Sequence, residues 1–153
     1  MSILSRYKKP GGFRQLLQLV ETSQPTKQAK LIEVIKKEDP HWAKLIIEKK
    51  ISPDMVLAWP PEHLATVFEY MTERHCASLL KAMDEEQLLI YFDLFKPEKT
   101  KSLRNQIDDI DEIKSTDTVN AHNNLLETVR FLDEEKKIIL RFIDPNLDLS
   151  EAA

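Results

Sequence analysis

The sequence has little of what several classes of protein depend on. Its 153 residues include one cysteine and two glycines. A single cysteine cannot form an internal disulfide, which fits a reducing compartment such as the cytoplasm. Two glycines are too few for a glycine-rich phosphate-binding loop. No apolar run approaches the roughly 18–20 residues that a membrane-spanning helix needs, and the first ten residues lack the apolar stretch of a signal peptide. We therefore expect a cytoplasmic protein that reaches a membrane only through partners.

The charge balance gives no general attraction to nucleic acid. Aspartate and glutamate number 26 against 22 lysines and arginines, so the formal net charge is −4. Nucleic-acid binding depends on cations that neutralise phosphates, and this chain has a net excess of anions. A hydrophobic content of 42% with 31% charged residues is typical of a soluble globular protein and not of a disordered one. The length suits one domain or two small subdomains.

No group of residues has the pattern of a catalytic or metal site. None of the four histidines lies four residues from another or at metal-ligand spacing from the cysteine. Cys76 belongs to an apolar helical stripe, so we predict a buried thiol rather than a nucleophile. A G-x-S-x-G nucleophile elbow is absent from the sequence. The sequence therefore predicts a protein that is not an enzyme and has no cofactor, no metal and no small-molecule substrate.

What the chain does contain is a repeated helical spacing. Apolar residues recur at i, i+3, i+4 and i+7, which is typical of amphipathic α-helices, and no segment shows an equally long strand-like alternation. The four clearest stripes run from Phe13 to Val20, Leu64 to Met71, Cys76 to Met83 and Leu88 to Phe95. Short one-sided helices must bury their stripes against one another. The pattern predicts an all-α fold, an armadillo-like stack followed by a small helical bundle, with Trp42, Leu79 and Phe92 in the core.

Prolines and short polar residues mark where helices begin. Asp39-Pro40 and Ser52-Pro53 each read as a capping residue followed by the first helical residue. Asp84 with Gln87 resembles a capping box, and Thr72 is predicted to cap the next helix upstream. These signals predict about eight short helices between residues 12 and 107 and a further one over residues 117–132.

The same prolines and short polar residues suggest how the chain divides into subdomains. We expect a lead over residues 1–10, an armadillo-like subdomain over 11–50, a C-terminal helical subdomain over 51–143 and a flexible tail over 144–153. The adjacent glycines, Gly11 and Gly12, are expected to give a flexible entry to the first helix. The apolar segment 138–143 fits either a helix end or a strand.

Several motifs occur together in one order. They are the glycine pair Gly11-Gly12, the D-P-x-x-A sequence from Asp39 to Ala43, the segment from Cys76 to Ala82, and Ala121-His122 followed by Arg130 to Ile138. In order and spacing, from Gly11 to Leu140, they resemble the middle and C-terminal part of FliG, the bacterial flagellar motor switch protein, without its N-terminal domain. The shared spacing carries the resemblance, rather than any one motif.

The resemblance implies an armadillo-like subdomain, a hinge and a C-terminal subdomain with a torque helix whose charges face the membrane stator. It implies protein partners: other copies of the chain, the switch protein FliM and a membrane ring protein. The family's hinge motif falls on residues 50–53, where Pro53 is expected to stiffen it.

The family's torque charges are only partly present. Two basic positions match Lys81 and Lys114, which are the candidate protein-binding residues. A third basic position falls on Glu98, and the family's acidic pair falls on the neutral Asn105 and Gln106. Because part of the family's charge pattern is missing, we do not expect this chain to transmit torque by that pattern alone.

Two functions follow as hypotheses. The first is a FliG-like scaffold in bacterial motility, part of the flagellar motor switch or a paralogue of it, which assembles through helix-face contacts at the cytoplasmic face of the inner membrane. The alternative is a cytoplasmic adaptor with a FliG-like fold, which binds a signalling protein or a peptide helix in its groove and has no motor role.

Overall fold

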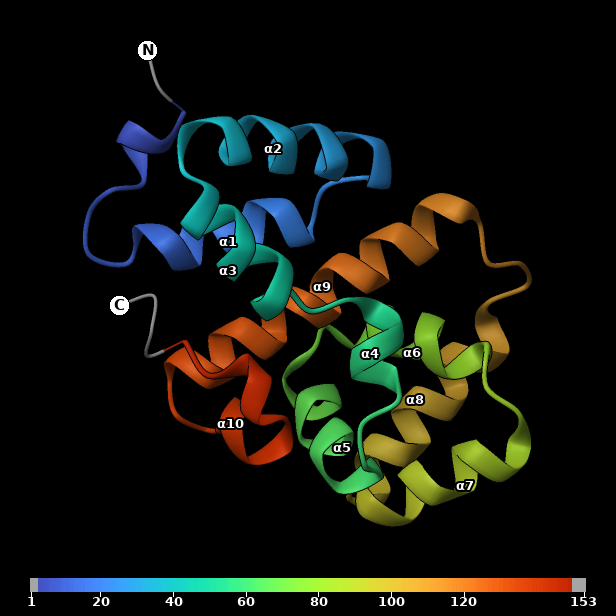
Figure 1. Cartoon of the computed structure of the whole chain (residues 1–153). Coiled ribbons are helices and arrows are strands. Elements are labelled where there is room, and N and C mark those ends of the chain that lie inside the picture. The colour runs from blue at the N-terminus through green and yellow to red at the C-terminus, as the bar shows by residue number, and fades with distance from the viewer. Residues whose placement is uncertain (1–2, 150–153) are drawn as a thin grey trace. The chain divides into compact units, whose positions relative to one another are not determined.

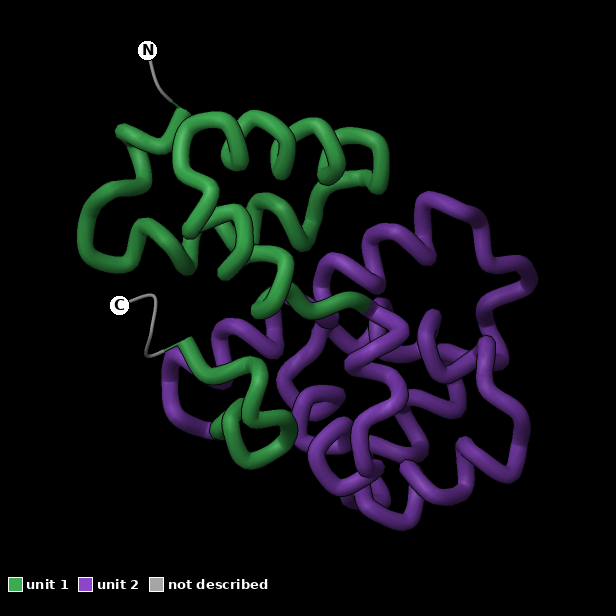
Figure 2. The backbone as a smooth tube through the Cα atoms, in the orientation of Figure 1, with its two compact units in different colours: residues 1–52, 139–153 green, residues 53–138 purple. Residues whose placement is uncertain are grey.

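A computed structural model of the chain describes residues 3–149, and every regular element among them is a helix (Figure 1). The all-α prediction is confirmed. Within the described range, residues 3–52 and 139–149 form one compact unit, and residues 53–138 form a second (Figure 2). The first unit thus includes residues 139–143, which the sequence division placed in the C-terminal subdomain, and the boundary between the units falls at Ser52.

The first unit is built on three helices. They are α1 (Gly12–Glu21), α2 (Pro25–Glu38) and α3 (Pro40–Lys49). Three short helices complete the unit: η1 (Leu4–Arg6), α10 (Leu140–Ile143) and η2 (Pro145–Leu147). Their apolar stripes meet in one core, where Leu16, Ile35 and Ile46 are fully buried. The returning end of the chain adds to this unit, because η2 packs on α3 and Leu149 packs on the core. The segment whose conformation the sequence left open is therefore helical at residues 140–143. Residues 144–149 of the predicted tail contain η2, and the rest of that tail lies outside the described residues.

The glycine pair forms a tight turn rather than a flexible entry. Gly11, the residue before α1, has φ = 78°, in the left-handed region that favours glycine. At Gly12 a Cβ atom would lie 1.8 Å from the main-chain oxygen of Tyr7. The chain therefore needs a glycine at each position for a different reason, a backbone angle at the first and close backbone approach at the second.

Substitution of Gly12 by alanine is expected to destabilise the protein by about 1–3 kcal/mol, because the new methyl group forces main-chain atoms apart in a packed region. Gly11→Asn is the matched control: no atom lies within 4 Å of its added Cβ, and asparagine tolerates the left-handed region. Thermal melts followed by circular dichroism measure both variants. An equal loss in the two would show that close approach at Gly12 is not the reason.

The second unit is organised around α6. Its helices are α4 (Pro53–Leu57), α5 (Pro61–Tyr70), α6 (Glu73–Lys81), α7 (Glu85–Leu94), α8 (Pro97–Asp109) and α9 (Ser115–Glu134). α6 packs on α8 and on the long α9, and α5 packs on α7 and α9. Phe68 lies in the core, with its ring edge-on to Tyr91 at 5.2 Å between centroids and to Phe95 at 6.4 Å. This packing holds α8 at the surface of the unit.

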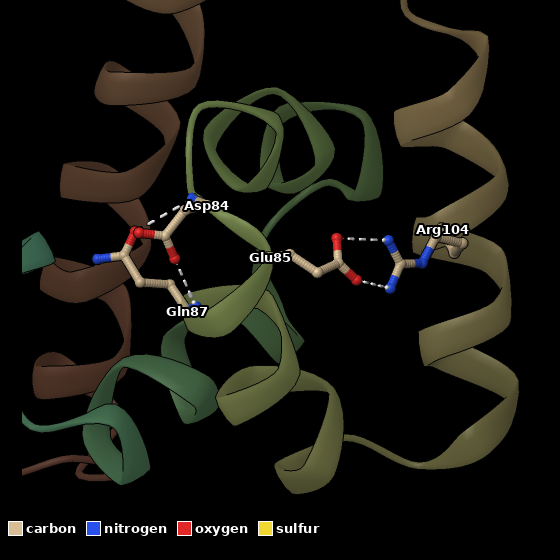
Figure 3. Close-up of polar contacts among 4 residues, drawn as sticks. All are labelled: Asp84, Glu85, Gln87 and Arg104. Atoms are coloured by element: carbon tan, nitrogen blue, oxygen red, sulfur yellow. Dashed lines mark hydrogen bonds and ion pairs between the residues drawn. The ribbon is translucent and has the colours of Figure 1, made fainter.

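Most predicted helix starts are confirmed. Asp39 Oδ1 accepts a hydrogen bond from the Trp42 N–H at 3.1 Å, which caps α3. Asp84 and Gln87 make both bonds of a capping box at the start of α7 (Figure 3). α6 begins at Glu73, directly after Thr72, as predicted. The Thr72 side chain makes no cap hydrogen bond, however, and its main-chain N–H donates to Asn124 Oδ1 at 3.2 Å. A contact from a distant helix replaces the local cap there.

Two of the three predicted core residues, Leu79 and Phe92, are buried, and Trp42 is only half-buried. One side of Trp42 packs edge-on against Phe13, and the Lys8 ammonium lies 3.8 Å from its ring centroid. Cys76 is fully buried, and that burial raises the pKa of its thiol to about 12. The thiol therefore stays protonated at neutral pH and packs as a small apolar group, as predicted.

Candidate protein-binding surface

One side of α8 faces solvent. Its apolar residues Leu103 and Ile107 are buried. The residues at helical spacing on the opposite side are exposed: Glu98, Lys101, Asn105, Asp108 and Asp109. We call these five residues the α8 outer face. It carries charges of both signs and is predominantly acidic, so it suits an electrostatic contact with another protein.

Contacts with α7 hold α8 in place from one side. Arg104 of α8 makes two hydrogen bonds to the Glu85 carboxylate, at 2.8 and 3.3 Å (Figure 3). Its guanidinium also lies 4.8 Å from the ring centroid of Phe92. The hydrogen bonds from Arg104 lower the pKa of Glu85, so this carboxylate remains ionised. A bidentate contact of this kind fixes the orientation of the two side chains as well as the distance between them.

Contacts with α6 hold α8 from another side. Glu73 Oε2 accepts hydrogen bonds from Ser102 Oγ at 2.8 Å and from Gln106 Nε2 at 2.7 Å. Gln106, one of the two neutral residues at the family's acidic positions, therefore binds within the unit, whereas Asn105 is exposed. The two adjacent residues thus have different environments.

Of the two candidate lysines, Lys81 forms a hydrogen bond within its own chain. Its side chain is half-buried, and its Nζ donates to the main-chain oxygen of Ile107 at 3.2 Å. That oxygen belongs to the last turn of α8, where unpaired carbonyls and the helix dipole favour a positive charge. Lys81 therefore stabilises the end of the helix that carries the outer face.

Lys114 is exposed and directly precedes α9. Its main-chain N–H donates to Asp117 Oδ2 at 3.1 Å, and its ammonium has no partner among residues 3–149. Within residues 3–149, no hydrogen bond joins the two lysines. The Lys81 ammonium reaches from α6 to the last turn of α8, and Lys114 directly precedes α9. Of the two, only Lys114 has a charge available to a partner.

Charge reversal at Lys81 is expected to lower stability by about 1–2 kcal/mol, because it removes a charge-assisted hydrogen bond and places an anion at the end of α8. The matched control is Lys101→Glu on the α8 outer face, where an exposed substitution is expected to change stability by less than about 0.5 kcal/mol. Urea unfolding measures both variants. Equal stability of the two would contradict the structural role of Lys81.

No metal-binding arrangement of three histidine, cysteine, aspartate or glutamate side chains occurs within residues 3–149. In the same part of the chain, no helix combines the length and apolar character needed to cross a membrane.

The residues that position α8 were not found from the sequence. The local sequence gives no sign of the roles of Glu73, Glu85 and Arg104, because the partners of these residues lie 19 to 33 residues away along the chain. The capping box next to Glu85 was detectable because its two residues lie within one helical turn.

Comparison with known families decides the assignment. The family model described as the FliG C-terminal domain matches residues 33–140. The chain belongs to the FliG C-terminal domain family. The match begins within α2 and extends over all helices from α3 to α9. A search of curated proteins finds no match. The predicted resemblance to FliG is thus confirmed.

The FliG C-terminal domain is a structural domain of the flagellar motor switch rather than an enzyme family, and it works through contacts between proteins. Three positions at which the resemblance expects torque charges, 98, 105 and 106, lie in α8. Two of them, Glu98 and Asn105, belong to the α8 outer face.

Proposed function

We propose that this protein is a FliG-like structural component of the flagellar motor switch, or a paralogue of one, and that it assembles through helix-face contacts. The observation that supports this most strongly is the family match over residues 33–140. On this proposal its partners are further copies of the chain and switch proteins of the FliM type. It is located at the cytoplasmic face of the inner membrane, which it reaches through those partners.

Exposed apolar residues support an assembly role. α7 exposes Leu89, Ile90 and Leu94, although its opposite side is buried. In the first unit, Ile47 is exposed beside a shallow apolar groove of about 230 Å³ between residues of α2 and α3. Apolar side chains gathered on one face of a soluble protein commonly mark protein contacts.

The charges favour docking over torque transmission. Lys114 is exposed and available for an acidic partner. Lys81 contributes to binding indirectly, because its bond to the Ile107 carbonyl stabilises the end of α8. Glu98 is acidic where the family has a basic residue, and Asn105 is neutral where the family has an acidic one. We therefore propose Lys81 and Lys114 as contributors to protein binding, the first as a positioning residue and the second as a direct contact.

The same departures favour one alternative, a cytoplasmic adaptor with the FliG fold that binds a signalling protein or a peptide helix and has no motor role. The two proposals differ in what they predict about self-association and swimming. A switch component self-associates and its loss impairs motility, whereas an adaptor binds one heterologous partner and its loss leaves swimming unchanged.

Multi-angle light scattering of the full chain over a range of concentrations, together with deletion of the gene in the source organism, tests the proposal. We expect the mass to rise with concentration and swimming to be lost, with recovery on re-expression of the wild-type chain. A strictly monomeric protein whose deletion leaves swimming intact would contradict the motor role and favour the adaptor.

A further inference from the structure

The first unit contains a cavity that is lined by basic side chains, although the whole chain has a net negative charge. The cavity has a volume of about 730 Å³ and lies beside the first turns of α1 and α3. Lys8, Lys9 and Arg14 line it together with His41, and none of the described residues that line it is acidic. The formal net charge of the chain is −4. Basic side chains therefore gather around one cavity on a protein with a net negative charge.

The three cations are not equivalent. Lys8 Nζ lies 2.6 Å from Asp39 Oδ2, so its charge is compensated within the chain. Hydrogen bonding from Lys8 holds the pKa of Asp39 below its ordinary value, so this ion pair persists at neutral pH. Lys9 is exposed, and its ammonium has no partner among residues 3–149. Lys9 is therefore the cation most available to an anionic ligand.

The rest of the lining is largely apolar. Trp42 is half-buried there, held edge-on against Phe13 with 5.3 Å between ring centroids, and Leu45 lies buried beside it. Tryptophan is among the residue types that most often dominate binding energy at protein interfaces, together with tyrosine and arginine. An apolar floor with cations around it suits a ligand that carries carboxylates next to an apolar side chain.

We propose that this basic cavity binds an acidic segment of a partner protein, in which a carboxylate pairs with Lys9 and an apolar side chain contacts Trp42. A peptide segment fits better than nucleic acid, because the few cations are gathered at one cavity and the rest of the chain repels phosphates. The volume lies within the range of about 300–1,000 Å³ found for ligand sites. The inference rests on the proposed function only in taking a protein as the partner.

Isothermal titration calorimetry of the full chain tests this directly. The probe is a synthetic glutamate-rich peptide with one central leucine, and its counterpart carries glutamine at every glutamate position. We expect the acidic peptide to bind in a salt-sensitive way and the glutamine peptide to bind at least about tenfold more weakly. Binding of the acidic peptide should also change the tryptophan fluorescence of a Trp59→Phe variant, in which Trp42 is the one tryptophan left.

Variants locate the site. Lys9→Glu is expected to weaken binding of the acidic peptide at least about tenfold, because it replaces one charge-assisted contact by a repulsion. The matched control, Lys30→Glu, makes the same charge change at an exposed position of α2 that does not line the cavity. It is expected to bind the peptide within about twofold of the wild-type chain. Circular dichroism melts check that both variants are folded.

Three results would overturn the inference. They are no binding of the acidic peptide by the wild-type chain, equal weakening by Lys9→Glu and Lys30→Glu, and Lys9-dependent binding of inorganic phosphate or a single-stranded oligonucleotide without binding of the peptide. None of these results depends on self-association or swimming, so failure here is distinguishable from failure of the proposed motor role.

Discussion

Replacement of Phe68 by alanine is expected to remove about 3–5 kcal/mol from the free energy of unfolding. Phe68 is 0% exposed on α5, and its ring packs edge-on against two aromatic rings. Truncation loses the transfer free energy of the ring and leaves a cavity that fixed helices cannot fill. Because a small domain has only about 5–15 kcal/mol in total, the cooperative thermal transition should be lost or strongly lowered. Circular dichroism during heating and in urea measures this.

Phe142→Ala is the matched control, since it makes the same chemical change at a ring that is 72% exposed. Substitution at such a position is expected to change stability by less than about 0.5 kcal/mol. If Phe68→Ala proves no more destabilising than Phe142→Ala, the aromatic contacts of α5 do not hold the second unit together.

Replacement of Glu21 by alanine is expected to cost about 1–3 kcal/mol, because it leaves a buried main-chain donor without its partner. Glu21, at the end of α1, is 6% exposed, and its Oε2 accepts a hydrogen bond from the Ile51 N–H at 2.8 Å. Ile51 is buried and directly precedes the boundary between the units. Faster hydrogen exchange of the Ile51 amide should accompany the loss of stability, because this part of the chain opens locally with greater ease.

Glu21→Gln separates hydrogen bonding from charge. Glutamine has nearly the same shape and keeps an oxygen that can accept from the Ile51 N–H. We expect Glu21→Gln to keep slow hydrogen exchange at the Ile51 amide and to be nearly as stable as the wild-type chain. Exchange as fast as in the alanine variant would show that the carboxylate charge, rather than the hydrogen bond, holds the segment.

The bond to the Ile51 N–H lies where the resemblance to FliG places the family's hinge motif, at residues 50–53. The boundary between the two units falls within the same four residues. Lys50 Nζ also contacts Gln28 Oε1 at 3.3 Å, so two consecutive hinge residues bind to the first unit. Pro53 begins α4, in the second unit, so the contacts of Lys50 and Ile51 mark the last part of the chain that is bonded to the first unit.

Features set by neighbours in the sequence were predictable from it. The apolar stripes identified the helices, and the residues before the prolines identified where several of them begin. The bonds of Asp84 and Gln87 lie within a single turn, so the residues themselves specify the capping box. Burial of Cys76, Leu79 and Phe92 followed from the helical period, because one face of each short helix has to be covered.

Features set by distant residues were decided only by the tertiary structure. Lys81 was predicted as a protein-binding residue, and its bond to the Ile107 carbonyl is visible only with α6 and α8 packed together. The same holds for the return of residues 139–149 to the first unit and for the gathering of Lys9, Arg14 and Trp42 around one cavity. Helical periodicity determines which face of a helix is buried, but it does not determine which other helix covers that face. That choice depends on the packing of side chains from many parts of the chain at once, so the local sequence determined the helices and the tertiary structure alone determined the surfaces they form.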